Sequence, residues 1–203
     1  MTTTTVRNPD VTRQRLLEAA FTEIYQHGYQ GMRVDDVLKR TGLGKGAFYH
    51  HFTSKHALGC AVVDEIINGE MGQRWMDALG ETEDPIPALE QVMDLIVESE
   101  TGNDGVFLGC PLNNLAMEMS AQDVAFRQRI EELFSQWINL IARAFARGQQ
   151  AGTVRNDIDP QEAGMFLVAS FEGCVGLAKA TQNMDNFIIC RKQITHYLNS
   201  LRP

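Results

Sequence analysis

The chain has 203 residues, of which 44% are hydrophobic and 22% are charged, so it can bury a substantial core and is not intrinsically disordered. The formal net charge of −8 is unevenly distributed: residues 1–60 carry +3 and residues 61–203 carry −11, so only the first part suits a polyanionic partner. The Thr-rich N-terminus has no apolar run and the four cysteines form no CxxC pair, so we expect a cytoplasmic protein with reduced thiols.

Apolar residues recur at helical spacing almost throughout and no strand-like alternation persists, which predicts an all-α fold. The first helix follows Asn8-Pro9, a capping residue with a proline behind it, and Gly28 is expected to end it in the left-handed conformation. A short second helix ends at the break Thr41–Gly44, and a third begins at about Lys45. Ser54 caps a fourth helix that extends to about residue 78.

The second part of the chain also predicts helices separated by clear stops. Gly152 is expected to end one helix, and Asp159-Pro160 is expected to begin the next. The most apolar stretch, 163–180, contains Glu172 and Lys179, so we interpret it as a buried helix and expect no membrane span. The predicted helices lie at 87–101, 111–119, 121–151, 160–182 and 185–201.

The segment with the clearest functional pattern is RVDDVLKRTGLGKGAFYHHFTSKHAL, residues 33–58. Two short helices joined by a glycine turn are typical of a helix-turn-helix, whose second helix enters a DNA major groove. Phe48 and Phe52 define the buried face of that helix, so small and polar residues lie on its open side. Lys45 is a candidate for reading guanine, and Lys55 with the free amides of the next helix is a candidate phosphate site. The candidate DNA-binding residues are Arg33, Thr41, Gly44, Lys45, Gly46, Ala47, Tyr49, His50 and Lys55.

Residues 12–58 resemble the N-terminal domain of TetR-family regulators, most specifically in the run GAFYHHFTSKHAL from Gly46 to Leu58. The resemblance implies a three-helix DNA-binding domain at 8–54, with a region that extends to about residue 70 along the fourth helix. It also implies a helical ligand-sensing and dimerisation domain at 55–203, and about nine helices in all. The chain has Met32-Arg33 where the family usually has a capping Ser or Thr. Arg33 either contacts phosphate or is simply solvated.

Cys110 lies in GVFLGCPLNNLAMEMS, residues 105–120, at the start of a predicted helix whose exposed amides favour a thiolate. The stretch is similar to a Gly-Cys stretch in some TetR-type repressors, including the N-ethylmaleimide reductase repressor, in which a cysteine responds to electrophiles. The alternative is a small buried residue with a packing role.

Two further sets of residues are candidates for the implied second domain. Aromatic and Met residues either line an apolar ligand cavity or belong to the plain core, and Asn114 or Glu118 is a candidate polar partner for a ligand. The candidate ligand-binding residues are Met93, Ile96, Phe107, Cys110, Asn114, Met117, Phe134, Trp137, Phe166 and Phe171. The last two helices form either a homodimer interface or a monomer core, and the candidate interface residues are Phe166, Gly173, Gly176, Leu177, Phe187, Ile194 and Leu198.

Together these patterns predict a DNA-binding regulator, a repressor released from a palindromic double-stranded operator by a small apolar or electrophilic ligand. The alternatives are an activator, a regulator without a ligand, or an enzyme that carries an incidental helix-turn-helix. No histidine or cysteine spacing suits a metal, and GLGKG at 42–46 lacks the spacing and preceding strand of a phosphate-binding loop. We therefore expect no cofactor, no metal and no catalytic residues.

Overall fold

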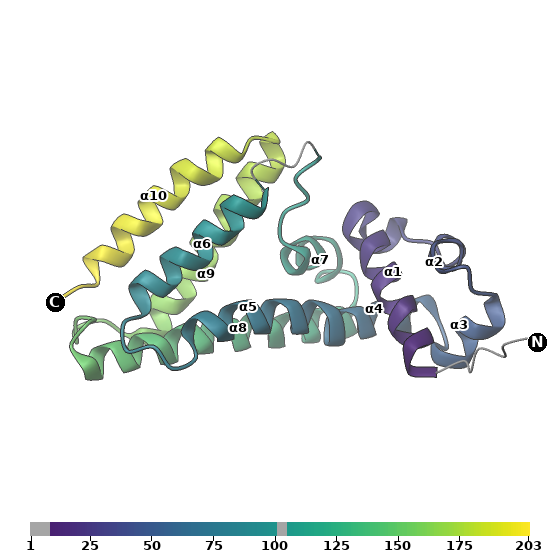
Figure 1. The fold of residues 1–203 in the computed structure, drawn as a ribbon, viewed down its shortest axis with the longest axis horizontal. Coiled ribbons are helices and arrows are strands. Elements are labelled where there is room, and N and C mark those ends of the chain that lie inside the picture. Colours follow the sequence, from purple (N-terminus) through teal and green to yellow (C-terminus); the bar gives the residue numbers. More distant parts are fainter. Residues whose placement is uncertain (1–8, 101–104) are drawn as a thin grey trace, which may run out of the picture. The chain divides into compact units, whose positions relative to one another are not determined.

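The computed structural model describes residues 9–100 and 105–203, and within these residues it contains helices and no strand, as predicted (Figure 1). The predicted cap at Asn8 lies outside the described residues. The helices are α1 (Pro9–Gly31), α2 (Val34–Thr41), α3 (Lys45–His51), α4 (Lys55–Ala61), the π-helical segment η1 (Val62–Ile67), α5 (Asn68–Leu79), α6 (Pro85–Glu100), α7 (Pro111–Met119), α8 (Val124–Ala151), α9 (Pro160–Thr181) and α10 (Met184–Ser200).

The helix ends follow from the capping residues in the sequence. The Ser54 hydroxyl accepts a hydrogen bond from the Ala57 amide at 3.0 Å, which confirms the predicted cap of α4. The Asp159 carboxylate accepts from the first free amides of α9, and Gly152 has a φ of 75° directly after α8. The π-helical segment η1 is not predicted, because nothing in its sequence distinguishes it from an α-helix.

The break in α1 differs from the expectation. Gly28 has φ 76° and ψ 163°, so it is not in the left-handed helical conformation, and the helical run resumes up to Gly31. The Glu118 carboxylate accepts hydrogen bonds from the amides of Tyr29 at 2.9 Å and Gln30 at 2.7 Å. These amides follow the break and have lost their intrahelical partners, so Glu118 takes the place of the missing carbonyls.

The chain divides into two compact units. Unit 1 comprises Met1–Gly69 and Asn114–Ile130, and unit 2 comprises Glu70–Asn113 and Glu131–Pro203. The domain boundary expected between residues 54 and 55 stays a prediction.

In unit 1, α1 packs against α2, α3 and α4 around fully buried residues such as Leu16, Val37 and Phe48. Among the glycines of unit 1, Gly59 of α4 has the nearest neighbours. A Cβ atom at this position would lie 2.6 Å from the Tyr29 ring and 2.9 Å from the Phe126 ring. The absence of a side chain at Gly59 therefore lets both rings pack directly against the helix.

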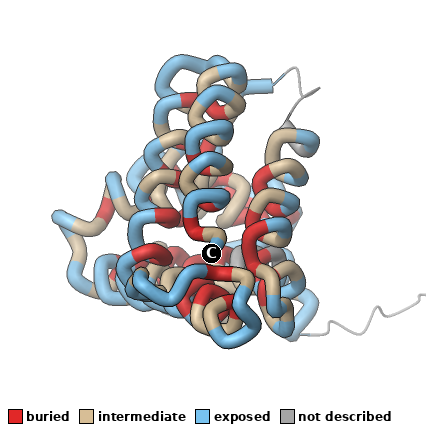
Figure 2. Tube along the Cα trace, turned by 90° about the vertical axis from the view of Figure 1, so that its left-hand side faces the viewer, coloured by how far each residue is buried: buried red, intermediate tan, exposed pale blue. Residues whose placement is uncertain are grey.

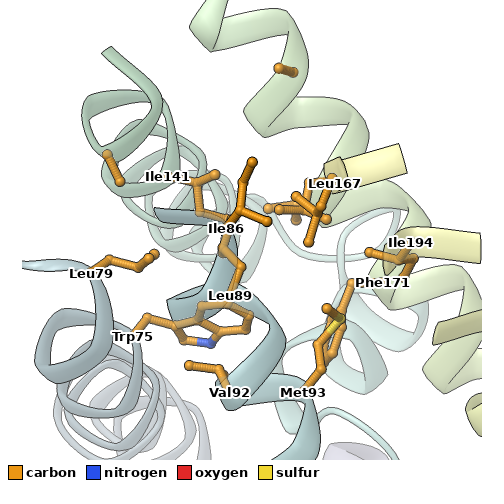
Figure 3. Packing of buried hydrophobic residues seen from close by; sticks show 14 of the residues in the cluster. Trp75, Leu79, Ile86, Leu89, Val92, Met93, Ile141, Leu167, Phe171 and Ile194 are labelled. Atoms are coloured by element: carbon orange, nitrogen blue, oxygen red, sulfur yellow. The ribbon is translucent and has the colours of Figure 1, made fainter. Parts of the chain in front are cut away.

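In unit 2, the core lies between α5, α6, α8, α9 and α10 (Figure 3). The Trp75 and Trp137 rings are 5.0 Å apart, and the Phe171 ring meets both of them edge-on. Each helix is buried along one side and exposed along the other (Figure 2). Within the described residues, α9 is the one helix with the length and composition of a membrane span, and half of its apolar window is buried inside the fold.

Candidate nucleic-acid interface and ligand cavity

The surface of α3 carries the residues suited to DNA. Phe48 is fully buried and fixes the orientation of the helix, which leaves Tyr49 62% exposed and His50 exposed beside it. A Cβ atom at Gly46 would meet nothing within 4 Å, so the backbone here is open to close approach. Lys45 makes an ion pair with Asp35 at 3.2 Å, and both side chains remain exposed. A phosphate or a base edge can compete for this lysine at little cost, because exposed ion pairs are weak.

The turn between α2 and α3 has the geometry expected of a helix-turn-helix. Gly42 adopts the left-handed conformation with φ 66° and ψ 20°, and its amide caps the end of α2. At the other end of α2, Arg33 occupies the capping position without a side-chain cap, as its residue type predicts. Arg33 is exposed, so both readings of it stay open.

Thr41 does not belong to the candidate DNA surface. Its side chain is buried, and its hydroxyl donates to the carbonyl oxygens of Val37 and Leu38 at 3.0 and 3.1 Å. The Thr41 carbonyl accepts a hydrogen bond from Arg15 at 2.6 Å. These bonds orient the end of α2 from within and leave the hydroxyl turned away from solvent.

Lys55 has a structural role that the sequence did not indicate. Its ammonium group donates to the carbonyl oxygen of Gln30 at 3.0 Å and lies 4.8 Å from the centre of the Tyr29 ring. Burial lowers the pKa of Lys55. The side chain therefore fastens α4 to the end of α1, and its contact with phosphate stays a prediction.

Two carboxylates, whose structural role the sequence does not indicate, hold the helices of unit 1 in place. Glu23 is buried and accepts hydrogen bonds from Arg40 at 3.0 and 2.7 Å, which joins α1 to α2. Glu118, a candidate ligand partner, holds the break in α1 instead. Both partners are distant in the sequence, and no local pattern marks them.

Unit 2 contains a cavity of about 10 Å³, which has room for a single water molecule. Three of the candidate ligand-binding residues, Met93, Trp137 and Phe171, line it together. The remaining lining residues are also apolar and come from α5, α6, α8 and α9: Trp75, Leu89, Ile141, Leu167 and Val168.

The other candidate ligand-binding residues do not line this cavity. Ile96, Phe107, Cys110 and Phe134 pack against the same apolar core. Met117 is 83% exposed and Phe166 is 53% exposed, so neither faces an internal cavity. Asn114 and Met117 belong to unit 1, because the chain passes from one unit to the other inside α7. A helical period shows which residues share a face, but it does not show which face is covered.

The thiol of Cys110 is not activated in this structure. Burial raises its pKa strongly, and the neighbouring Glu172 carboxylate raises it further. The backbone amides of Leu112 and Asn113 act in the opposite direction, as expected at a helix start, but they do not outweigh burial. The predicted lowering of this pKa is therefore wrong, and Cys110 is a thiol at neutral pH.

The candidate dimer residues fall into two groups. Phe166, Gly173 and Leu177 of α9 are exposed and Gly176 is partly exposed, and a Cβ atom at either glycine would meet nothing within 4 Å. In contrast, Phe187, Ile194 and Leu198 of α10 are buried in the core of their own chain. The assignment of these three α10 residues to an interface is corrected: their stripe faces α9 and α6 of the same chain.

Fold and surface together define a helix-turn-helix DNA-binding protein with a separate all-helical unit. Residues 16–62 match the family described as bacterial regulatory proteins, tetR family, and residues 85–194 match the family of tetracyclin repressor-like C-terminal domains. The chain is 31% identical to an uncharacterised helix-turn-helix transcriptional regulator of Lactococcus lactis over 177 residues, which span 86% of each protein. It is 29% identical to the transcriptional repressor DhaR of Mycobacterium sp. strain GP1 over 181 residues, which span 87% of this chain and 88% of DhaR.

Solved structures show the same fold. A TetR transcriptional regulator from Chloroflexus aurantiacus has a TM-score of 0.83 at 24% identity, and covers 96% of this chain and 97% of its own. The reduced form of Escherichia coli NemR has a TM-score of 0.81 at 23% identity, and covers 91% of this chain and 95% of its own. The chain belongs to the TetR family of bacterial transcriptional regulators.

Proposed function

We propose that this regulator binds a palindromic operator as a homodimer in the cytoplasm and represses transcription until a small molecule binds unit 2. The observation that carries the proposal is the exposed surface of α3, which presents Lys45, Gly46, Tyr49 and His50. Such a face fits a major groove, because small residues admit the backbone and polar residues reach phosphates and base edges.

The dimer interface in this proposal lies on α9. Its outer face exposes Met165, Phe166 and Leu177. Gly173 and Gly176, where an added Cβ would have open space, lie between Phe166 and Leu177 in the sequence. Ile189 adds an exposed apolar side chain on α10. An isologous contact between two copies of this face buries it, as a two-fold interface requires.

Release from DNA in this proposal is a shift between two populations of the protein. The cavity in unit 2 is too small for an inducer, so an inducer binds a conformation in which the cavity is larger. The inducer lowers operator affinity by the extent to which it prefers that conformation.

The first experiment selects bound sequences from random DNA and measures their affinity by fluorescence anisotropy. We expect a palindromic site, and we expect Lys45→Ala to weaken specific binding by roughly 1–3 kcal/mol, the contribution of one good base contact. Arg143→Ala on α8 removes an exposed cationic side chain outside both proposed surfaces and is expected to leave the affinity unchanged. If no selected sequence binds more tightly than competitor DNA at moderate salt, the proposal fails.

The second experiment tests the dimer by light scattering. We expect Phe166→Glu to produce folded monomers, because an introduced charge would be desolvated in the interface. Leu95→Glu on α6 alters a comparably exposed apolar residue outside the proposed interface and is expected to leave the mass unchanged. A dimer that persists in the Phe166→Glu variant rules out this interface. A reporter gene behind the selected operator separates a repressor from an activator.

A further inference from the structure

The core of unit 2 contains one carboxyl group that its own surroundings do not satisfy. Glu172 of α9 is only 7% exposed, and neither of its carboxylate oxygens makes a hydrogen bond within the described part of the chain. A buried carboxylate without partners is costly, because it has lost its hydration and gained nothing in exchange. The fold would be more stable with an apolar residue at this position.

The groups that face this carboxyl come from the start of α7. The Cys110 thiol and the Asn113 side chain lie close enough to lower the pKa of Glu172, but burial outweighs them, and both groups are neutral. Along α9, the side chain of Lys179 extends past Gly109, next to Cys110 in the chain. Neither the thiol nor the amide supplies the positive charge that an ionised carboxylate needs.

The carboxyl is also placed next to the cavity. Val168 and Phe171 line the cavity. Glu172 is not itself a lining residue, but it is buried on α9 four residues after Val168, which places it one turn further along the same face of the helix. Phe171 lies beside Met93 and close to Trp75 at this point of the core (Figure 3). The residues that line the cavity are all apolar, and Glu172 is a buried acidic residue on the turn of α9 that follows Val168.

We infer that unit 2 binds a small apolar amine, whose hydrocarbon body occupies an enlarged form of the cavity and whose ammonium group pairs with Glu172. The inference rests on the proposed function, in which unit 2 senses a ligand. A cation is favoured over an anion because the ionised carboxylate only accepts hydrogen bonds, and because residues 61–203 carry a net charge of −11. The body must be compact, since the free cavity of about 10 Å³ grows only as far as side chains such as Met93 can move.

The pH dependence of binding follows from the ionisation of Glu172. Burial raises its pKa to about 7, so the ionised fraction falls about tenfold between pH 8 and pH 6. Simple alkylamines and arylalkylamines stay protonated in this range. Their affinity is therefore expected to fall about tenfold from pH 8 to pH 6, while a neutral ligand of the same shape binds without this trend.

The test compares isobutylamine, cyclohexylamine, benzylamine and 2-phenylethylamine with the corresponding alcohols. Binding to the full-length protein is measured by calorimetry at pH 6 and pH 8, without DNA. We expect at least one amine to bind at least tenfold more tightly than its alcohol at pH 8. We expect Glu172→Gln to abolish this preference and the pH dependence, whereas Glu131→Gln, which alters an exposed carboxylate on α8, retains both. Thermal unfolding of each variant shows that it is folded.

A second arm adds the same amines to the complex with the selected operator. We expect an amine that binds to weaken operator binding by the wild-type protein and not by Glu172→Gln. If no amine is preferred over its alcohol, or if Glu172→Gln retains the preference, the inference is overturned even where operator binding is intact. Failure of the proposed function gives a different result, because the protein then binds no selected DNA even before an amine is added.

Discussion

Glu172 should make the protein less stable as the pH rises, and this can be measured without any ligand. Its pKa is raised from the ordinary 4.5 to about 7, mainly because burial disfavours the ionised form. Each pKa unit corresponds to about 1.4 kcal/mol, so above pH 7 the carboxyl costs the native state roughly 3 kcal/mol relative to a neutral residue of the same shape. Because the pKa is raised in the folded state, this cost depends on pH in one direction. Below pH 4.5 the carboxyl is protonated in both the folded and the unfolded chain, so the cost disappears, and it grows as the pH rises to 7.

The assay is thermal unfolding of Glu172→Gln and wild type at pH 4.5 and pH 8, at one protein concentration. At pH 8 we expect Gln to raise Tm by about 6–12 °C, since 1 kcal/mol shifts Tm by about 2–4 °C in a protein of this size. At pH 4.5 the two proteins are expected to unfold within about 2 °C of each other. Glu131→Gln provides the control for loss of an exposed charge. An equal shift at both pH values, or a lower Tm at pH 8, would refute the reasoning.

Three other perturbations test the packing and the thiols. Gly59→Ala is expected to destabilise the protein by about 1–3 kcal/mol in urea unfolding, because its Cβ would lie 2.6 Å from an aromatic ring. The control Gly69→Ala has open space for the added Cβ and is expected to be neutral or stabilising. Equal effects of the two substitutions would contradict this packing. Glu118→Ala is expected to speed hydrogen exchange of the amides at residues 29 and 30 at least tenfold, since their acceptor is removed, and unchanged exchange counts against the contact. Cys174, whose pKa is raised to about 12 by burial and by Cys190, is expected to react with iodoacetamide about 1000-fold more slowly at pH 7.5 than an ordinary thiol, and mass spectrometry that finds an ordinary rate would refute this.

Helix positions were predictable because their signals are local. The range predicted for α7, 111–119, is the observed one, and α9 begins at the predicted Asp159-Pro160. A capping side chain bonds to an amide two or three residues away, so a short stretch of sequence contains the whole interaction. Gly28 shows the limit: its residue type indicates a break in α1, but the acceptor of the amides that follow the break is Glu118, 90 residues further along the chain.

Which neighbour covers each side of a helix was less predictable. The stripe of Phe187, Ile194 and Leu198 was correctly expected to share one side of α10, but that side packs inside the chain and not against a partner. Met117 was expected to be internal and is exposed. In both cases the period is a property of the helix alone, whereas burial depends on which neighbours cover it. The exposed side of α3 was predicted correctly, because the buried Phe48 fixes the orientation of so short a helix.

The cost of Glu172 and its proposed affinity for amines are two consequences of one arrangement. Above pH 7 the empty protein contains an ionised, unpaired carboxylate in an apolar core, and an ammonium group bound beside it removes part of that cost. The conditions that most destabilise the free protein are therefore those in which the amine binds best. A carboxyl with a purely structural role would instead have its partners within the fold, as Glu23 and Glu118 have in unit 1. A buried carboxylate whose oxygens find no hydrogen-bond partner among residues 9–100 and 105–203 is a local departure from favourable packing, and such departures are typical of binding sites.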